Sequence, residues 1–210
     1  MDLLAEFVRA CREAGATAPD DDLQGAGTSL LERWSSPRRG YHDVLHLTEV
    51  LERLDVVGEH AAATRLAAWF HDAVYEGRPG QDERDSADLA VTELTALGIP
   101  PETADRVASL VLVTADHEPD DDHGEALCDA DLAVLASGHE RYAAYVAGVR
   151  REYSHVDTDT FRAARAAVLA DLLGREHLFR TDHGRRHWDA AARANLAAEL
   201  THLRDDQGTP

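Results

Sequence analysis

The chain has 210 residues, of which 44% are hydrophobic, so it is long enough and apolar enough to bury a sizeable core. Its 40 acidic residues outnumber the 21 basic ones, and the formal net charge of -19 argues against binding to duplex nucleic acid. The same charge opposes small anionic substrates, so any bound phosphate needs local arginines and a metal ion.

Cysteine usage and hydropathy both indicate a soluble, cytoplasmic protein. Cys11 and Cys128 have no metal-ligand spacing, which is typical of ordinary thiols in a reducing compartment. The first apolar run carries Asp2 and Glu6, so it fits neither a signal peptide nor a membrane span. No stretch approaches the roughly 18 consecutive apolar residues of a spanning helix. We therefore expect no membrane partner.

Apolar residues recur at helical spacing from the first residues onward. A polar, glycine-containing stretch, 19–27, separates the first two expected helices, and the Pro- and Gly-containing stretch 35–40 is expected to be a loop. The helices predicted in this half run from Leu3 to Gly15, around Leu30 to Trp34, from Tyr41 to Leu54, and through the apolar run 61–74. Residues 77–80 break the last of these.

The second half of the chain continues the helical pattern. An amphipathic helix over 82–97 is closed by Gly98, and prolines at 100 and 101 start the next helix, which runs to Val113. After a polar loop, 117–124, further helices are predicted over 129–136, 139–153, 158–173 and 185–203. No alternating strand pattern of useful length occurs. We expect one all-α domain over residues 1–204, followed by a disordered tail, 205–210.

A mixed set of nitrogen and oxygen ligands lies on separate predicted helices. The pair His71-Asp72 ends the most apolar helix, His46 lies on the helix before it, and Asp131 on a later one. Such a set suits Mn, Co, Ni, Fe or Zn, with Mg as a further candidate, and leaves positions for water and substrate. Asp129 competes with Asp131 for this role, although it also fits a helix N-cap. A buried His/Asp hydrogen-bond network without metal is the structural alternative.

Six segments in order give the chain a family likeness. They are PRRGYHDVLHL, AAWFHDAVY, DERDSADLA, LVTADH, LCDADLAVL and VRREYSHV, and they span about residues 30–200. With these segments the chain resembles the HD-domain superfamily of metal-dependent phosphohydrolases, in a compact bacterial branch described as predicted phosphohydrolases. The resemblance implies a single-domain HD-type helical bundle with a metal site between its central helices.

The resemblance also implies the ligands and the reaction. The metal ligands would be His46, His71, Asp72 and Asp131. The reaction would be hydrolysis of a phosphate ester or anhydride of a small metabolite, in first place a nucleotide, by metal-activated water.

Several further residues are candidates for catalysis or substrate binding. For the reaction itself we name Asp72, together with Glu83 as a base and His117 as a proton donor, substrate contact or second-metal ligand. Glu83 also fits the ordinary preference of a helix start for acidic residues. His117 lies where a helix runs into a loop.

For substrate binding we name Arg39, His42 and Glu76. Arg39 precedes the metal helix and suits a phosphate clamp, although a surface loop arginine is an equal interpretation. His42 lies four residues before His46, which would place both on one helical face.

One departure from the family keeps other functions open. Characterised nucleotidase and guanosine-tetraphosphate hydrolase relatives carry an acidic residue three positions after the His-Asp pair, where this chain has Tyr75. One alternative is a di-iron oxygenase, which needs additional histidines such as His117 and His123. The other is a non-catalytic ligand-binding module on the same fold. The sequence leaves the oligomeric state open.

Overall fold

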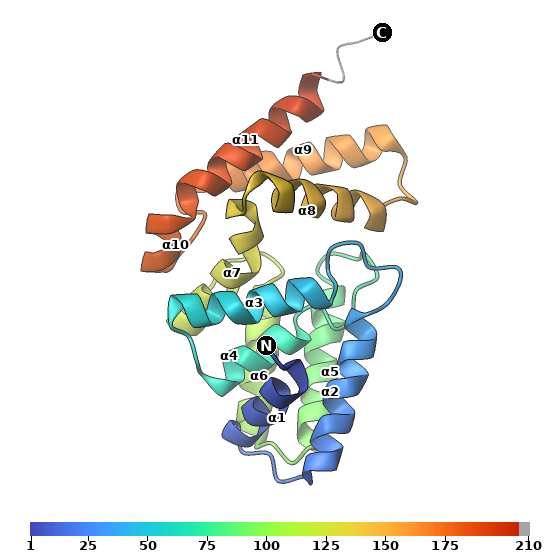
Figure 1. The fold of residues 1–210 in the computed structure, drawn as a ribbon, viewed down its shortest axis with the longest axis vertical. Helices are drawn as coiled ribbons and strands as arrows, with labels where there is room; N and C mark the ends of the chain where they lie inside the picture. Colours follow the sequence, from blue (N-terminus) through green and yellow to red (C-terminus); the bar gives the residue numbers. More distant parts are fainter. Residues whose placement is uncertain (206–210) are drawn as a thin grey trace.

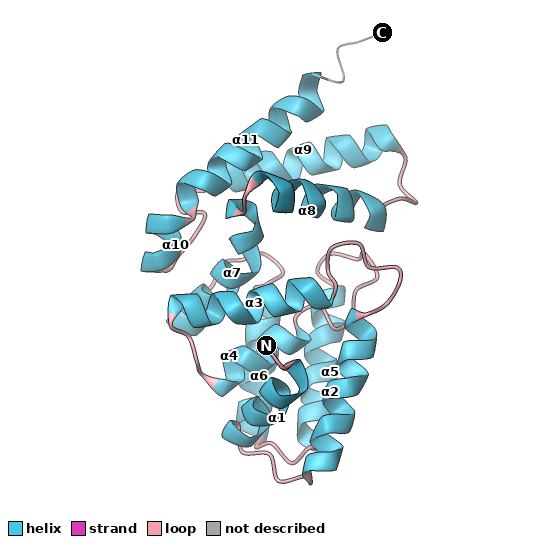
Figure 2. Ribbon diagram, viewed as in Figure 1, coloured by secondary structure: helices cyan, strands magenta, loops and turns pink. Residues whose placement is uncertain are grey.

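Every regular element in residues 1–205, the part of the chain that the computed structural model describes, is helical (Figures 1 and 2). This confirms the all-α prediction. Among these residues, no helix combines the length and the apolar character needed to cross a membrane. The α-helices are α1 (Leu3–Glu13), α2 (Asp20–Trp34), α3 (Val44–Val57), α4 (Ala62–Phe70), α5 (Asp82–Ala96), α6 (Pro101–Val113), α7 (Asp122–Leu132), α8 (His139–Glu152), α9 (Thr158–Gly174), α10 (Asp182–His187) and α11 (Asp189–Asp205), and the 3-10 helix η1 spans Ala133–Ala136.

The helices α1 to α7 share one hydrophobic core (Figure 1). Phe7 of α1 lies edge-on against Trp69 of α4, with ring centroids 5.0 Å apart. Trp34, at the end of α2, donates its indole N–H to the Trp69 carbonyl at 3.0 Å. Large aromatic side chains bury the most apolar area per residue, and they dominate the stability of such a core. This core therefore fixes α4, the helix that leads into His71.

A buried ionic contact adds a second constraint on α4. The Glu6 carboxylate of α1 accepts hydrogen bonds from Arg65 Nε and Trp69 Nε1, both at 2.5 Å. Arg65 also donates to Asp55 of α3 at 2.7 Å. A buried charge is tolerated only when it is paired and hydrogen-bonded in this way. The network ties α1, α3 and α4 to one another.

The carboxyl-terminal helices form a second core together with η1. Tyr142 and Tyr145 of α8 are buried there beside Phe179 and Leu196. The Tyr142 hydroxyl donates to Glu199 of α11 at 2.5 Å. In Figure 1 these helices lie above α3, and the two cores meet along α7 and η1. The junction of the two cores is where the candidate site lies.

Two glycines bring the loop before α3 directly onto α8. A Cβ atom on Gly148 would lie 2.7 Å from the Gly40 carbonyl oxygen, closer than side-chain carbons come to backbone. Arg151 donates to the same Gly40 carbonyl at 2.6 Å. Glycine is needed at this contact because only a residue without Cβ permits such a close approach of two backbones.

The first difference between the predicted and the observed helices is the start of α2. The stretch 19–27, expected to separate the first two helices, is helical from Asp20 onward, because Asp20 opens α2 with two more acidic residues in a turn where the helix dipole favours negative charge. Gly27 lies inside α2 and faces Phe7, whose Cδ1 would be 2.9 Å from a Cβ atom there. This glycine therefore serves close helix–helix contact and not a turn.

Helix α3 begins at Val44, three residues after the predicted start at Tyr41. Asp43 is the N-cap, and its carboxylate accepts from the backbone N–H groups of Leu45 and His46. His42 therefore lies before the helix, and the expected shared helical face with His46 does not exist.

Two later boundaries differ as well. The polar loop 117–124 ends at Asp121, which caps α7 by accepting from the Gly124 N–H at 2.8 Å. Asp129 thus lies inside α7 and is not an N-cap. The predicted helix 185–203 is two helices that meet at Trp188. Of the expected tail, Asp205 closes α11, and 206–210 lie outside the described residues.

Candidate metal centre

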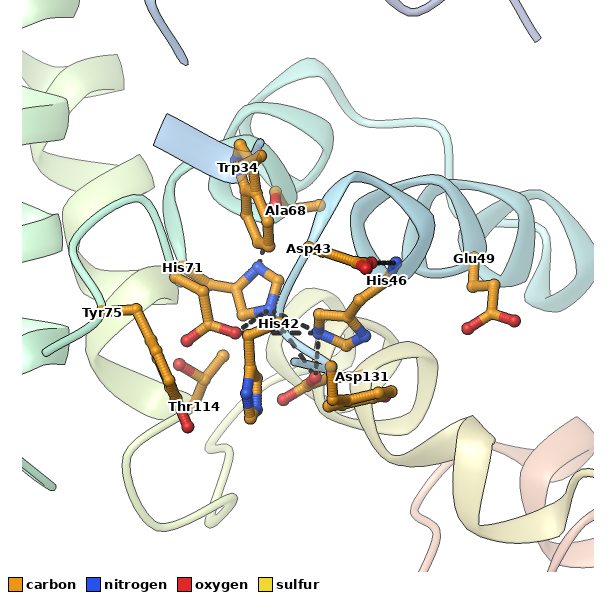
Figure 3. A network of polar contacts seen from close by, with 12 residues as sticks. Trp34, His42, Asp43, His46, Glu49, Ala68, His71, Tyr75, Thr114 and Asp131 are labelled. Carbon is orange, nitrogen blue, oxygen red and sulfur yellow. Dashed lines mark hydrogen bonds and ion pairs between the residues drawn. The ribbon is translucent and has the colours of Figure 1, made fainter. Parts of the chain in front are cut away.

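Four predicted ligands converge from three parts of the first core. His46 lies in the first turn of α3, His71 is the C-cap of α4, Asp72 follows it, and Asp131 lies near the end of α7. Both histidines are 1% exposed, and the two aspartate side chains are 16% exposed. The two rings turn toward the Asp131 carboxylate in Figure 3.

The ligand atoms lie at separations that suit one shared ion. His46 Nε2 is 3.1 Å from His71 Nε2 and 3.1 Å from Asp131 Oδ1. Asp72 Oδ2 lies 3.2 Å from His71 Nε2 and 3.7 Å from His46 Nε2. Ligands bound about 2.1 Å from one ion are about 3.0 Å apart in octahedral and about 3.4 Å apart in tetrahedral geometry. His46, His71 and Asp131 thus form a group that could hold a metal ion.

The His71 ring is held in the tautomer that a ligand needs. Its Nδ1 lies 2.9 Å from the Ala68 carbonyl oxygen, which can only accept, so Nδ1 carries the proton. In the neutral ring, the lone pair of Nε2 then faces the two carboxylates and the His46 ring. Electron pairs that face one another at these distances repel unless a metal ion or a proton lies between them. The cluster can therefore hold a divalent metal, and without one a proton on His71 Nε2 would hydrogen-bond to the carboxylates.

Electrostatics in the cluster agree with this donor set. Burial lowers the pKa of His46 and keeps its imidazole neutral, the form that binds metals. Burial alone raises the pKa of Asp131, but hydrogen bonds from His117, His46 and His71 hold it well below its usual value. Burial also lowers the pKa of His71, but Asp72 and Asp131 raise it further, so a positive charge is favoured at this point.

His117 lies beside the cluster and contacts Asp131. Its Nε2 is 2.8 Å from Asp131 Oδ2, which leaves Oδ1 of Asp131 toward His46. The backbone of His117 has a φ of 56°, a left-handed conformation that a non-glycine residue rarely adopts. It lies in the turn that ends α6, where its N–H donates to the Val113 carbonyl at 2.9 Å.

A pocket of about 420 Å³ opens from the ligand cluster toward the second core. His71, Asp72, His117 and Asp131 line one part of it, and residues of α8 and α9 line another. Glu83 of α5 also lines this pocket, and its buried Oε2 has no hydrogen-bond partner among the described residues. An unpartnered buried carboxylate oxygen is rare, and it is explained by an ordered water, by an ion or by a catalytic role.

Glu152 is the residue of this site that the sequence analysis missed. One of its oxygens accepts from the backbone N–H groups of residues 40–42 at 2.7 to 3.0 Å. The other lies 2.8 Å from His42 Nδ1 and accepts from the Tyr75 hydroxyl at 3.2 Å. Although burial raises it, the hydrogen bonds from His42 and the backbone lower the pKa of Glu152 to about 2. The one signal for Glu152 was its place in the VRREYSHV segment.

His42 lines the pocket because Glu152 holds it there. Its ring stacks on Tyr75, with ring centroids 4.2 Å apart at 26°. Burial lowers the pKa of His42, but Asp72 and Glu152 raise it further, so the net shift is upward. With Nδ1 bonded to Glu152, Nε2 is the ring nitrogen left for a ligand. The structure therefore brings His42 to the site by a contact across the fold and not by helical spacing.

Two residues predicted to bind substrate, Arg39 and Glu76, do not line the pocket. Arg39 is buried and donates to the backbone carbonyls of His42 and Asp72 at 2.6 and 2.7 Å, with its guanidinium 5.0 Å from the Trp34 ring centroid. It joins the loop before α3 to the His-Asp turn, and it does not line the pocket. Glu76 is half-exposed and accepts from Arg38 at 3.2 Å, outside the pocket lining.

The competing ligand, Asp129, faces away from the metal cluster. Its carboxylate accepts from the backbone N–H groups of Arg180 and Thr181 and from the Thr181 hydroxyl at 2.6 to 2.8 Å. Burial raises its pKa, but these hydrogen bonds compensate in part. Asp129 thus joins α7 to the start of α10, and Asp131 is the aspartate at the centre.

The sequence matches no family model, no curated protein and no solved structure. The likeness to HD-domain phosphohydrolases therefore stays a prediction carried by the six segments. The observation that bears on function is the grouping of His46, His71 and Asp131, which could hold a metal ion.

Proposed function

We propose that this protein is a metal-dependent phosphohydrolase that acts on a small phosphorylated metabolite. The observation that carries the proposal is the grouping of His46, His71 and Asp131 around one point beside the pocket, with Asp72 Oδ2 3.2 Å from His71 Nε2. A divalent ion bound by these residues supplies Lewis-acid activation of a phosphoryl oxygen and of water. Three ligands form the group that could hold an ion, and Asp72 is proposed as the fourth.

Glu83 is proposed as the group that accepts a proton from the attacking water. It lines the same pocket, and no side chain in residues 1–205 is hydrogen-bonded to its buried Oε2. A general base must be free to take the proton and must lie within reach of the reacting water. The unpartnered oxygen of Glu83 supports the first of these two requirements.

His42 is proposed to bind the phosphoryl group and to protonate the leaving oxygen. Its Nδ1 is held by Glu152 at 2.8 Å, which orients the ring and favours the imidazolium form. An imidazolium in a buried pocket stabilises charge that develops on the phosphoryl oxygens. His117 is a positioning residue, because it holds the Asp131 carboxylate through Oδ2.

The proposal is tested by metal content and phosphate release together. Protein purified without chelator is expected to hold about one transition-metal ion per chain and to release phosphate from small phosphate esters. His71→Ala should lose both, and Asp72→Asn should weaken both. The matched control is His177→Ala, an exposed histidine outside the pocket, which should keep metal and activity.

Three outcomes would contradict the proposal. Full hydrolysis by metal-free His71→Ala protein would remove the metal from the mechanism. Two iron ions per chain, without phosphate release, would favour the oxygenase alternative. No uptake of manganese, cobalt, nickel or iron would leave a non-catalytic module on this fold.

A further inference from the structure

The pocket beside the metal centre has an apolar wall. Aliphatic and aromatic side chains from the end of α7, from η1 and from α8 and α9 form this wall. They are Leu132, Val134, Leu135, Val149, Phe161 and Val168. Val168 is 50% exposed although it is apolar, so part of the wall is open to water. Exposed apolar surface that adjoins a polar site is typical of a place that a ligand covers.

The pocket offers no free cation to a second phosphate group. Two arginines line it, and both are already paired: Arg78 with Asp82 and Asp85 at 3.0 and 2.9 Å, and Arg165 with Glu199 at 2.7 Å. The Arg165 side chain is only 9% exposed. Within residues 1–205, no other arginine lines this pocket, and the chain contains no lysine.

Negative charge surrounds the space beyond the metal ligands. Asp82 and Glu83 line the pocket in addition to Asp72 and Asp131. A diphosphate or triphosphate would place further charge beside these carboxylates, in a protein whose net charge is already -19. The lining therefore favours a single phosphate, bound at the ligand cluster with His42 Nε2 as a hydrogen-bond partner.

From these features we infer that the substrate is a phosphate monoester whose alcohol part is apolar. This inference rests on the proposed phosphohydrolase function. The phosphate binds at the ligand cluster, and the alkyl or aryl part lies against the wall formed by η1, α8 and α9. A volume of about 420 Å³ is near the lower end of the range of small-molecule pockets, so the apolar part is small.

The first experiment compares kcat/KM for ethyl, butyl and hexyl phosphate, phenyl phosphate, glycerol phosphate and nucleoside mono- and triphosphates. We expect kcat/KM to rise roughly fourfold per methylene until the wall is covered. Glycerol phosphate and the nucleoside triphosphate should be at least about tenfold poorer than butyl phosphate. A nucleoside monophosphate as the best substrate would overturn the apolar assignment.

A substitution in the apolar wall provides a second test of the substrate assignment. Val168→Lys adds a free cation to the apolar wall, so KM should rise for butyl phosphate and fall for the nucleoside triphosphate. The matched control is Val56→Lys. Val56 has a similar exposure (46%) and lies outside the pocket, so this substitution should change neither KM value. Equal effects of the two substitutions would overturn the assignment.

A binding measurement separates this inference from the function on which it rests. Butylphosphonate, which is not hydrolysed, should bind with a negative heat-capacity change and more tightly than a hydroxylated phosphonate of equal length. Phosphate release from all esters without preference for apolar ones would overturn the inference alone. If no ester is hydrolysed, the proposed function fails, and equal binding of the two phosphonates overturns the apolar pocket as well.

Discussion

Among single residues, Glu152 connects the carboxyl-terminal helices to the metal centre. Its side chain is 3% exposed, and it holds the backbone of residues 40–42 together with the His42 ring. A carboxylate that accepts several N–H bonds has a low pKa because each donor stabilises the charged form. The low pKa is therefore a measure of how strongly Glu152 stabilises the folded state.

Glu152→Gln is expected to reduce the free energy of unfolding by about 3 kcal/mol at pH 7. The folded-state pKa of about 2 lies below the usual 4.5, so the contribution is complete above pH 4.5 and is lost as the pH falls toward 2. Urea denaturation at several pH values should therefore show that the difference in free energy of unfolding between the unsubstituted protein and Glu152→Gln decreases below pH 4.5. Glu140→Gln, at an exposed position of the same helix, is the control and should change stability by less than about 0.5 kcal/mol. A difference in free energy of unfolding that does not change with pH would contradict the stabilising role of the Glu152 charge.

At the level of elements, the contact between the loop before α3 and α8 decides whether the site is assembled. Gly148 lies inside α8, where alanine would normally be the better helix former. Its missing Cβ makes room for the Gly40 carbonyl, and this contact places Glu152 over residues 40–42. The loss of helix propensity is thus offset by a contact between elements.

Gly148→Ala is expected to destabilise the protein by about 1–3 kcal/mol, because overpacking outweighs the gain in helix propensity. Gly25→Ala, inside α2 with no atom within 4 Å of the added Cβ, should stabilise it by about 0.5–1 kcal/mol. Thermal or urea denaturation of the two variants measures this difference in sign. Stabilisation by both substitutions would show that the loop moves away from α8 without cost.

At the level of the whole molecule, the ligand cluster links metal binding to stability. Its four residues come from segments as far apart as α3 and α7, so the unfolded chain has no comparable site. An ion that binds only the folded state raises the unfolding temperature by mass action. The net charge of -19 also attracts divalent cations without specificity, so a variant must separate the two effects.

Manganese at about 100 times its Kd should raise the unfolding temperature by roughly 5–10 °C, and a chelator should reverse the rise. The same addition to His71→Ala should give only the small effect of the acidic surface. Differential scanning calorimetry with and without chelator measures both. An equal rise in the two proteins would mean that the ion does not bind at the cluster.

The sequence alone determined the helical class and the residue types of the proposed metal ligands. Helical periodicity is local, so the bounds of α5, α6, α8 and α9 follow from nearby residues and their caps. His46 and His71 were also predictable from their places on apolar helices, whereas the choice of Asp131 over Asp129 came from the family likeness and from the structure.

The tertiary structure alone decided which other residues reach the site. Glu152 contacts residues about 110 positions away, Gly148 faces Gly40, and Arg39 turns to backbone carbonyls and not to the pocket. The sequence carries no local signal for such contacts, because a glutamate or an arginine on a helix or loop is usually solvated. The pocket likewise exists only where α8 and α9 come to lie beside the ligand cluster. Local patterns thus predict helices and ligand types, and long-range contacts decide which side chains surround the substrate.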